Sequence, residues 1–234
     1  MNKLKTILFA ACSLVLVTMI GTTVKADSSN FAGPYIGLTA SGYGIAMSGT
    51  STSAADDTEG STDEVQLGKV AAVVGGEIGY ALPLGSAFLL DVGAAFYSGE
   101  TMIRHDGGKD GDANRRVAFK IDDLVTIYIA PTLVLSDTSS LYVKVGLTEA
   151  NIGVEGNVTA PGDLSGTTWA IGTRTVLNSG IFIRTEAGYT DYNGISAHGT
   201  NAASDTAGTG IQQTTSYSAE PTIAFGTVAL GFRF

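Results

Sequence analysis

The sequence predicts an all-β chain that folds as one eight-stranded antiparallel up-and-down transmembrane β-barrel. Three observations support this fold class. Apolar residues alternate with small or polar ones in eight segments, as they do in strands with one apolar face. Short and long connections alternate strictly between the segments, which is typical of membrane barrels. The charged residues of most segments fall on the face opposite the apolar stripe.

The first 26 residues have the pattern of a secretory signal peptide. The basic start MNKLK precedes the apolar run ILFAACSLVLVTMI, and VKA places Ala26 at the expected cut. Two alternatives remain open: a membrane-anchoring helix, for which the apolar run is short, and a lipoprotein signal at Cys12. We therefore expect residues 1–26 to be a signal peptide and residues 27–234 to be the barrel domain. That domain has no cysteine, because Cys12 is the only one in the chain.

Each predicted strand is long enough for a tilted membrane crossing, which needs roughly 9–11 residues. The strands are expected at residues 35–44, 66–82, 87–99, 119–135, 141–152, 167–177, 181–192 and 219–234. The connections PLGS, SDTSS and NSG predict tight turns. Polar stretches predict four long loops, at residues 46–65, 100–118, 153–166 and 193–218. An even number of strands leaves both chain ends on the periplasmic side, with the tight turns.

The fourth strand fits this pattern least well. Asp123 shares the parity of the apolar residues Val125 and Ile127, so we expect it near the outer rim, where a charge costs little. Pro131 predicts a bulge or the end of the strand, since proline cannot donate a hydrogen bond to a neighbouring strand.

The polar face of the strands is rich in glycine and carries few charges, whereas a water-soluble β-sandwich or lipocalin-like barrel would expose many. A sparse set of mixed sign is typical of a closed interior in which ions pair. Two readings of this set remain open: a salt-bridged plug, or a narrow path for ions. The seven residues of the predicted interior network are Glu77, Asp91, Lys144, Arg174, Arg184, Glu186 and Arg233.

The final segment, TVALGFRF, alternates up to its last residue. Phe232 and Phe234 are expected to face lipid at the periplasmic interface, where membrane barrels carry aromatic girdles. The last strand must also pair with the first, because an open strand edge is not tolerated in hydrocarbon.

The segments FAGPYIGLTASGYG (31–44), GIFIRTEAGYTDY (180–192) and TVALGFRF resemble the eight-stranded outer-membrane β-barrels of the OmpA/OmpX-like family, which includes porin-like barrel domains. The resemblance covers the whole predicted mature chain. It implies a place in the bacterial outer membrane, with lipopolysaccharide and other outer-membrane lipids as partners. It also implies that the terminal aromatic residues, Phe232 and Phe234, are read by the barrel-assembly machinery. Unlike full-length OmpA-type proteins, this chain is expected to carry no peptidoglycan-binding domain after the barrel.

Composition and motifs exclude several kinds of partner. The formal net charge of −9 argues against nucleic acid, and we expect no cofactor. The acidic stretch DDTEGSTDE (56–64) is either a solvated loop or a surface for a ligand or divalent ions. In DGGKDGDAN (106–114), the weak metal-ligand candidates are Asp106, Asp110 and Asp112. Gly108 and Val117 stand where calcium ligands belong, so we expect no metal.

An enzymatic function is the third alternative. The only histidines, His105 and His198, lie in predicted loops. His105 and Asp106 could form a protease-like pair with Asp56 and Asp57 of another loop, but spacing alone does not establish such a site. Neither histidine lies on a strand beside a serine nucleophile. We therefore expect a structural or interactive protein that is not an enzyme, with a narrow porin as the alternative.

Overall fold

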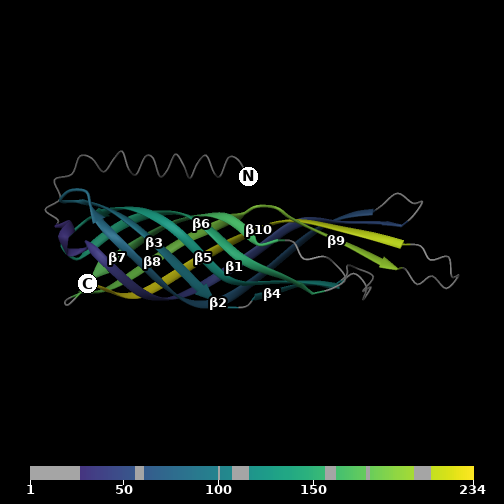
Figure 1. The fold of residues 1–234 in the computed structure, drawn as a ribbon, viewed down its shortest axis with the longest axis horizontal. Helices are drawn as coiled ribbons and strands as arrows, with labels where there is room; N and C mark the ends of the chain where they lie inside the picture. The colour runs from purple at the N-terminus through teal and green to yellow at the C-terminus, as the bar shows by residue number, and fades with distance from the viewer. Residues whose placement is uncertain are drawn as a thin grey trace.

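The computed structural model describes residues 27–55, 61–99, 101–106, 116–155, 162–177, 180–202 and 212–234. Within these ranges nearly all of the chain is β-strand, and the strands form one antiparallel sheet that closes on itself (Figure 1). The wall runs β1-β2-β3-β5-β6-β7-β8-β10, and β10 pairs with β1. Strands β4 and β9 extend β3 and β8 outward along β5 and β10. The predicted eight-stranded barrel is confirmed.

A short 3-10 turn, η2 (Ser28–Asn30), precedes the first strand. Among the described residues, no helix is long and apolar enough to cross a membrane. The strands are β1 (Gly33–Ala55), β2 (Ser61–Pro83), β3 (Phe88–Ser98), β4 (Thr101–Asp106), β5 (Arg116–Val134), β6 (Ser139–Glu155), β7 (Leu164–Val176), β8 (Ile181–Tyr192), β9 (Ile195–Ala202) and β10 (Gln212–Arg233).

The prediction of four long loops was wrong for most of the loop residues that the structure describes. Residues 46–55 and 61–65 are paired strand, and so are residues 101–106, 116–118, 153–155, 195–202 and 212–218. Hydrophobic alternation marks a strand only where one of its faces meets an apolar environment. Beyond the membrane both faces are polar, so the Ser- and Thr-rich hairpins lose that signal although their backbones remain paired. In Figure 1 these extensions project from one end of the barrel, here called the loop end.

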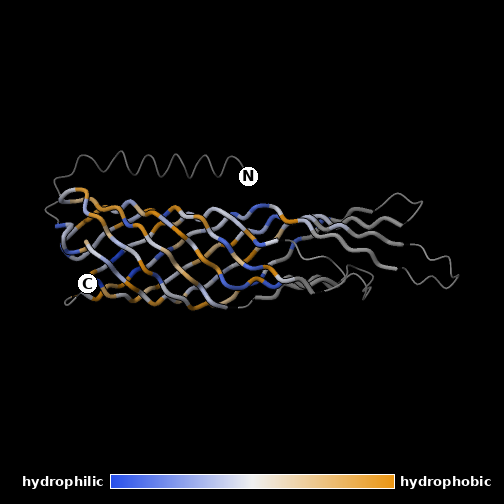
Figure 2. The backbone as a smooth tube through the Cα atoms, viewed as in Figure 1, coloured by the Kyte–Doolittle hydropathy of each residue, from blue (hydrophilic) through white to orange (hydrophobic). Residues whose placement is uncertain are grey.

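The outer wall of the barrel is apolar along most of its length. Its exposed side chains include Leu38, Val74, Ile127, Leu147 and Leu230. Figure 2 shows apolar residues recurring along each strand of the barrel body. A soluble protein would bury such a band. The alternative of a soluble sandwich or lipocalin-like barrel is therefore wrong.

Strand β5 contains a β-bulge at Asp123, the residue that broke the alternation in the sequence. The pairing with β6 shifts register between Asp122 and Val125, and Asp123 has a φ of 47°. This bulge places two residues between the inward-facing Ile121 and Leu124, and Asp123 is exposed. Pro131 causes no such shift: it lies within β5 opposite Leu90, and the strand ends three residues later at Val134.

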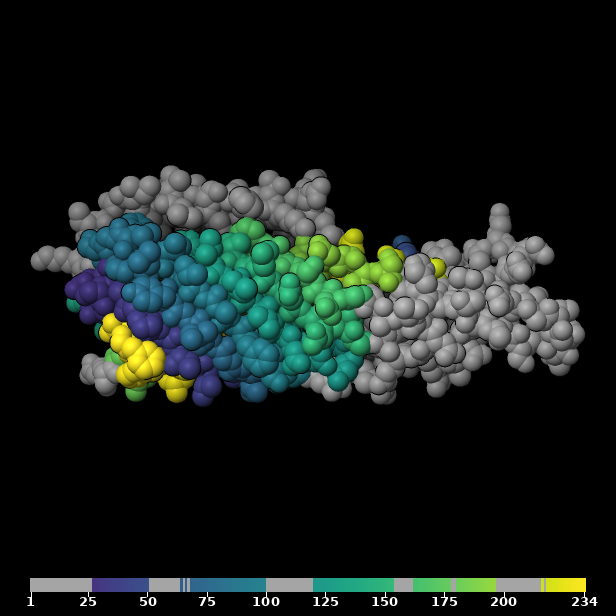
Figure 3. Space-filling model, in the orientation of Figure 1, coloured from purple at the N-terminus to yellow at the C-terminus, as the bar shows by residue number. Residues whose placement is uncertain are grey.

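The tight turns and both ends of the described chain lie at the other end of the barrel, here called the turn end (Figure 1). Tyr35 pairs with Arg233, and the two strands remain paired as far as Ala55 and Gln213. In Figure 3 the first and last strands lie side by side on the near face. This seam leaves no open edge in the wall.

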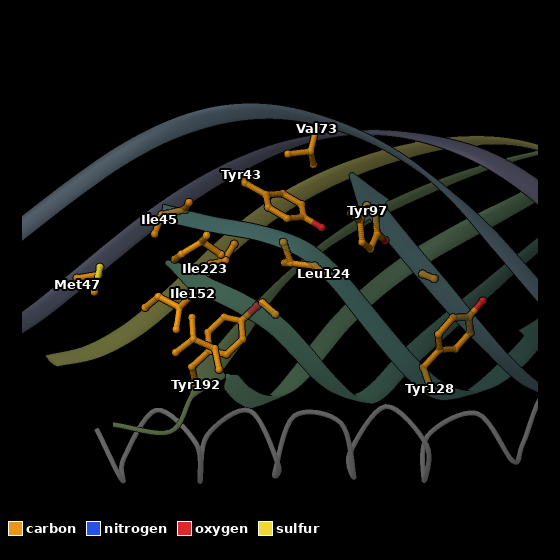
Figure 4. Packing of buried hydrophobic residues seen from close by; sticks show 14 of the residues in the cluster. Tyr43, Ile45, Met47, Val73, Tyr97, Leu124, Tyr128, Ile152, Tyr192 and Ile223 are labelled. Atoms are coloured by element: carbon orange, nitrogen blue, oxygen red, sulfur yellow. The ribbon is translucent and has the colours of Figure 1, made fainter. Parts of the chain in front are cut away.

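Inward-facing residues fill the bore in successive layers. Strand β8 passes through all of them, from the turn end outward: Phe182, Arg184, Glu186, Thr190 and Tyr192. Phe182 belongs to a small apolar cluster at the turn end, and Tyr192 to a larger one toward the loop end. Figure 4 shows Tyr43, Ile45, Leu124 and Ile223 of the larger cluster converging inside the wall. Charged side chains and hydroxyls lie between the two clusters.

Candidate functional site

Six of the seven residues of the predicted interior network lie buried in the bore. They comprise three acids and three bases, drawn from β2, β3, β6, β7 and β8: Glu77, Asp91, Lys144, Arg174, Arg184 and Glu186. Because side chains alternate between the two faces of a strand, each of the six points from the wall into the narrow bore. The buried charges balance in sign, which is the condition under which ions are tolerated away from water.

The first ion pair joins Arg184 of β8 to Glu77 of β2. The distance from Arg184 Nη1 to Glu77 Oε2 is 2.9 Å, and β10 and β1 separate the two strands in the wall. Tyr128 lies within 3.4 Å of both of these atoms and donates its hydroxyl proton to the carboxylate. The pair therefore spans the bore and does not simply follow the wall.

The second ion pair joins Lys144 of β6 to Glu186 of β8, across β7. Tyr142 donates to Glu186 Oε2 at 2.9 Å and accepts from Arg184 Nε at 3.3 Å. The Lys144 ammonium also lies 4.4 Å from the centre of the Tyr128 ring. The two pairs are thus joined through tyrosines into one network.

The third ion pair lies closer to the turn end. Arg174 Nη2 of β7 is 2.8 Å from Asp91 Oδ1 of β3, with β5 and β6 between them in the wall. Thr132 donates to the second carboxylate oxygen at 2.7 Å. The Arg174 guanidinium is 4.7 Å from the centre of the Tyr35 ring and 5.2 Å from that of Phe182. Cation and carboxylate are both enclosed.

The aromatic residues of this network were missed in the sequence. Tyr35, Tyr128 and Tyr142 are fully buried, and the hydroxyls of Tyr35 and Tyr128 lie 3.0 Å apart. A signal was present, because Tyr128 and Tyr142 have the parity of the charged residues and not that of the apolar stripes. Tyrosine at such a position brings a ring to fill the bore and a hydroxyl to bind the ions.

Each of four interior rings lies over a glycine directly opposite it on the neighbouring strand. A Cβ atom added at Gly93 would meet the Tyr128 hydroxyl oxygen at 2.7 Å and the ring at 2.8 Å. The four pairs in register are Tyr35↔Gly79, Gly93↔Tyr128, Tyr142↔Gly172 and Gly231↔Phe182. The interior glycines therefore provide the space that the rings occupy.

A row of threonine hydroxyls crosses four consecutive strands on the loop-end side of the ions. Thr126, Thr148, Thr168 and Thr190 are each hydrogen bonded to the next through their side chains. On the opposite wall, Ser41 and Thr227 make a similar bond at 2.7 Å across the seam. These hydroxyls satisfy one another and lie between the charged layer and the apolar side chains nearer the loop end.

Some buried polar atoms of the network lack a partner among the described residues. They are Glu77 Oε1, Arg174 Nε and Arg184 Nη2, together with the hydroxyl oxygens of Thr39 and Tyr192. Arg184 Nη2 is 4.0 Å from Glu186 Oε2, which is an ion-pair distance but too long for a hydrogen bond. Atoms of this kind are suited to bind water inside the bore.

Arg233, the seventh predicted member, is not part of this network. It lies near the end of β10, below the ion pairs, and is half-buried. Its Nη1 donates to the carbonyl oxygens of Ala32 at 3.0 Å and Ser29 at 3.4 Å. Its parity correctly predicted the inner face of β10. However, Arg233 is the last residue of that strand, at the turn end, and its side chain does not reach the interior carboxylates.

The N-terminal segment that Arg233 binds was also missed in the sequence. Phe31 is fully buried at the turn end, in the cluster of Tyr35, Ala81, Leu89, Val134 and Phe182. Hydrogen bonds from the side chain and backbone of Ser29 lower the pKa of the exposed Asp27 carboxyl. No periodic pattern in the residues before β1 predicts this arrangement.

The remaining candidates lie elsewhere. Phe232 and Phe234 are exposed at the turn end, with ring centres 5.2 Å apart in an edge-to-face arrangement. Asp106 ends β4, His105 precedes it and His198 lies in β9. Residues 1–26, Asp56, Asp57, Asp110 and Asp112 lie outside the described residues. Among the residues described, no group of three or more potential metal ligands occurs.

Comparison with known proteins agrees with this architecture. The profile of the family "Outer membrane protein beta-barrel domain" matches residues 12–220. No curated protein sequence matches the chain. Outer membrane protein OprG from Pseudomonas aeruginosa is 10% identical, with a TM-score of 0.53 over 90% of this chain and 100% of OprG.

Two further solved structures are similar at lower scores. The outer membrane protease OmpT from Escherichia coli is 9% identical, with a TM-score of 0.47 over 86% of this chain and 97% of OmpT. The attachment invasion locus protein Ail of Yersinia pestis is 9% identical, with a TM-score of 0.34 over 84% of this chain and 99% of Ail. At these identities the likeness concerns the fold alone. Because the family profile spans most of the sequence and the fold is a closed barrel with an apolar outer band, the chain belongs to the outer membrane protein β-barrel domain family and lies in the bacterial outer membrane.

Proposed function

We propose that this protein is a closed barrel that supports envelope integrity or surface interaction through its loop-end hairpins and does not act as an open channel. The observation that carries the proposal is the set of three ion pairs buried inside the bore, Glu77–Arg184, Glu186–Lys144 and Asp91–Arg174. Each buried charge already has a partner of opposite sign. A passing ion would have to displace one of these partners at a high electrostatic cost.

The surroundings of the ion pairs support the same proposal. An eight-stranded barrel has an interior just wide enough for side chains to fill. Here tyrosine rings and apolar side chains occupy the space on both sides of the charged layer. An apolar layer disfavours hydrated ions, because it offers no polar group to replace their water.

The loop-end hairpins support an interactive role. Strands β1 and β2 remain paired from the apolar band out to Ser53 and Ser61. Exposed carboxylates flank the outer rim, including Glu64, Asp123, Glu149 and Glu220. We infer that these hairpins reach past the lipid and present polar surface to lipopolysaccharide or to an extracellular ligand.

A narrow porin is the second candidate, and one observation favours it. The unpartnered atoms Glu77 Oε1, Arg174 Nε and Arg184 Nη2 leave polar capacity inside the bore. Water bound there could join across the charged layer and carry small ions. We do not propose an enzyme, since the six buried charged side chains in the described part of the chain are paired with one another.

Export and assembly complete the proposal. We infer that residues 1–26 are removed as a signal peptide, which leaves Asp27 as the first residue. We also infer that Phe232 and Phe234 form the signal read by the barrel-assembly machinery, because both rings are exposed at the turn end beside the closing seam.

Single-channel conductance of the refolded mature chain tests the plug against the pore. The informative variant is Arg184→Ala, and Lys69→Ala, an exposed base on the loop-end side of the ion pairs, is the matched control. Silence from the native chain and from Lys69→Ala, with current steps only in Arg184→Ala, would support the plug. Discrete steps from the native chain that change in Arg184→Ala would instead establish the porin.

A further inference from the structure

We propose that residues 27–32 form a stopper in the periplasmic mouth of the barrel, locked by the amino group that signal-peptide removal creates. The stopper is the Phe31 ring with the turn that carries it. The lock is an ion pair between the new α-ammonium of Asp27 and the carboxylate of Asp137. The lock rests on the proposed cut after Ala26, whereas the stopper does not.

Phe31 is buried inside the mouth of the barrel at the turn end. Its side chain is 0% exposed and belongs to a buried cluster whose other members come from β1, β2, β3, β5 and β8. A ring that is fully buried in a cluster drawn from five strands of a closed wall lies inside the bore. It lies below Arg174, whose guanidinium stacks near Tyr35 and Phe182 of the same cluster. Phe31 thus closes the bore on the side of the ion pairs that faces the periplasm.

Polar contacts hold the segment against three separate parts of the turn end. Ser28 bonds to the β2–β3 turn through its backbone N–H, which donates to Ser86 O at 2.9 Å, and its hydroxyl, which donates to Gly85 O at 2.6 Å. Asn30 donates to Asp137 O of the β5–β6 turn at 3.2 Å. Arg233 of β10 donates to Ala32 O at 3.0 Å. The segment is therefore fixed around the mouth and not only at its attachment to β1.

The backbone nitrogen of Asp27 contacts the side chain of Asp137. It lies 3.3 Å from Asp137 Oδ1. In the precursor this nitrogen is a neutral peptide N–H. In a chain that begins at Asp27 it is an ammonium group with an ordinary pKa of about 7.7–8.0, so it is largely charged near neutral pH. The Asp27 ammonium and the Asp137 carboxylate then form an ion pair at the same distance. Removal of the leader thus strengthens the contact that holds the stopper.

The mature sequence makes the stopper measurable, because it contains no cysteine once Cys12 is removed. An Ala32→Cys variant places one thiol on the half-buried side of the segment. A Thr138→Cys variant places a reference thiol in an exposed turn. The labelling rate of the refolded mature chain with an uncharged maleimide reports how often the segment opens.

We expect the thiol at position 32 to react at least about tenfold more slowly than the thiol at position 138, since labelling requires local opening. Adding Phe31→Ala should remove this protection while the barrel stays folded, as judged by its strand signal in circular dichroism. Equal rates at positions 32 and 138 in the chain that retains Phe31 would overturn the stopper.

The lock is tested by Nα-acetylation, which removes the charge of the terminal nitrogen but keeps an N–H donor. Acetylation and Asp137→Asn should each raise the labelling rate at position 32 about two- to fivefold, the range for an exposed ion pair. Acetylation of the Asp137→Asn chain should add nothing further, because the two changes remove one interaction. The control Glu220→Gln, at the loop end, should change nothing.

Additive effects, or no effect of acetylation, would overturn the lock and leave the stopper standing. The mass of the protein purified from outer membranes tests the cut separately. A mature chain that begins at a residue other than Asp27 would show that the leader assignment failed. Slow labelling at position 32 in the refolded chain would still establish the stopper in that case.

Discussion

Arg184 and Glu77 are 107 residues apart in sequence, yet Arg184 Nη1 lies 2.9 Å from Glu77 Oε2. Between their strands lie β10 and β1, the two strands that close the barrel. The ion pair therefore bridges the closing seam from inside the bore. It links the second strand of the wall to the seventh and holds together the part of the barrel that forms from opposite ends of the chain.

Removing one partner of this pair should strongly destabilise the barrel. Arg184→Leu leaves Glu77 charged and enclosed, so we expect a loss of about 3–5 kcal/mol in the free energy of unfolding. Urea unfolding of the protein in vesicles measures the loss. The double variant Glu77→Leu/Arg184→Leu should be more stable than Arg184→Leu alone. A double variant that loses the sum of both single losses would contradict an interaction between the two.

Because interior rings pack over glycines, we expect even a methyl group at such a glycine to destabilise the barrel. Gly93→Ala should cost about 1–3 kcal/mol, because a Cβ atom there would lie 2.7 Å from the Tyr128 hydroxyl oxygen and 2.8 Å from the Ile78 backbone oxygen, so both the ring and the neighbouring strand would have to shift. Gly42→Ala is the matched control, since nothing lies within 4 Å of the added atom. Equal stability of the two variants in urea unfolding would show that Tyr128 does not depend on the glycine.

The lipid-facing surface predicts a position-dependent cost of charge. Val74 is 65% exposed on the outer face of β2, within the apolar band. Val74→Arg should cost about 2–4 kcal/mol in vesicles, the range for an arginine at the bilayer midplane. Gln66→Arg lies on the same face of the same strand but nearer the loop end, and should cost about 0–1 kcal/mol. Similar losses for both would contradict the assigned depth.

Deleting Phe234 should slow assembly of the barrel in cells. The ring is exposed and packs edge to face with Phe232, so its removal takes away an aromatic residue at the seam without opening the core. Pulse-chase labelling of outer-membrane fractions measures the effect. Refolding of the same variant into detergent serves as the control and should proceed normally. Normal assembly in cells would refute the role of Phe234 as a signal.

The turn at Asp27 predicts a pH dependence at the mouth. Hydrogen bonds from Ser29 lower the pKa of the Asp27 carboxyl in the folded chain below its unfolded value. This stabilisation is therefore fully present above the unfolded pKa and is lost as pH falls through the folded one. Exchange protection of the Ser29 amide should decrease over that range. In Asp27→Asn the protection should not follow this titration, and an identical decrease would refute the assignment.

The sequence predicted the wall better than its ends. Leu38, Ile127 and Leu230 alternate with small or polar neighbours because one face meets lipid, and that contrast identifies both faces. The contrast disappears beyond the membrane, so the paired hairpins looked like loops. The bulge at Asp123 was visible only as a break in parity, since its register shift depends on pairing with β6.

The interior was predicted in part for a similar reason. Glu77, Lys144 and Arg184 were found because a charge on an inward-facing position is rare. Which acid pairs with which base depends on strand order and stagger, and those follow from closure of the sheet. Phe31 and its turn carry no periodic signal, because their position is set by contacts with residues far away in sequence.

The seam has a consequence for the making of the protein. The paired residues of the seam, such as Tyr35 and Arg233, belong to β1 and β10. The sheet therefore cannot close until both of these strands are present. A chain truncated anywhere before β10 would keep an open strand edge, which hydrocarbon does not tolerate. Closure of the barrel therefore depends on the presence of β10. Only a chain that contains both β1 and β10 can close into a barrel without an open edge.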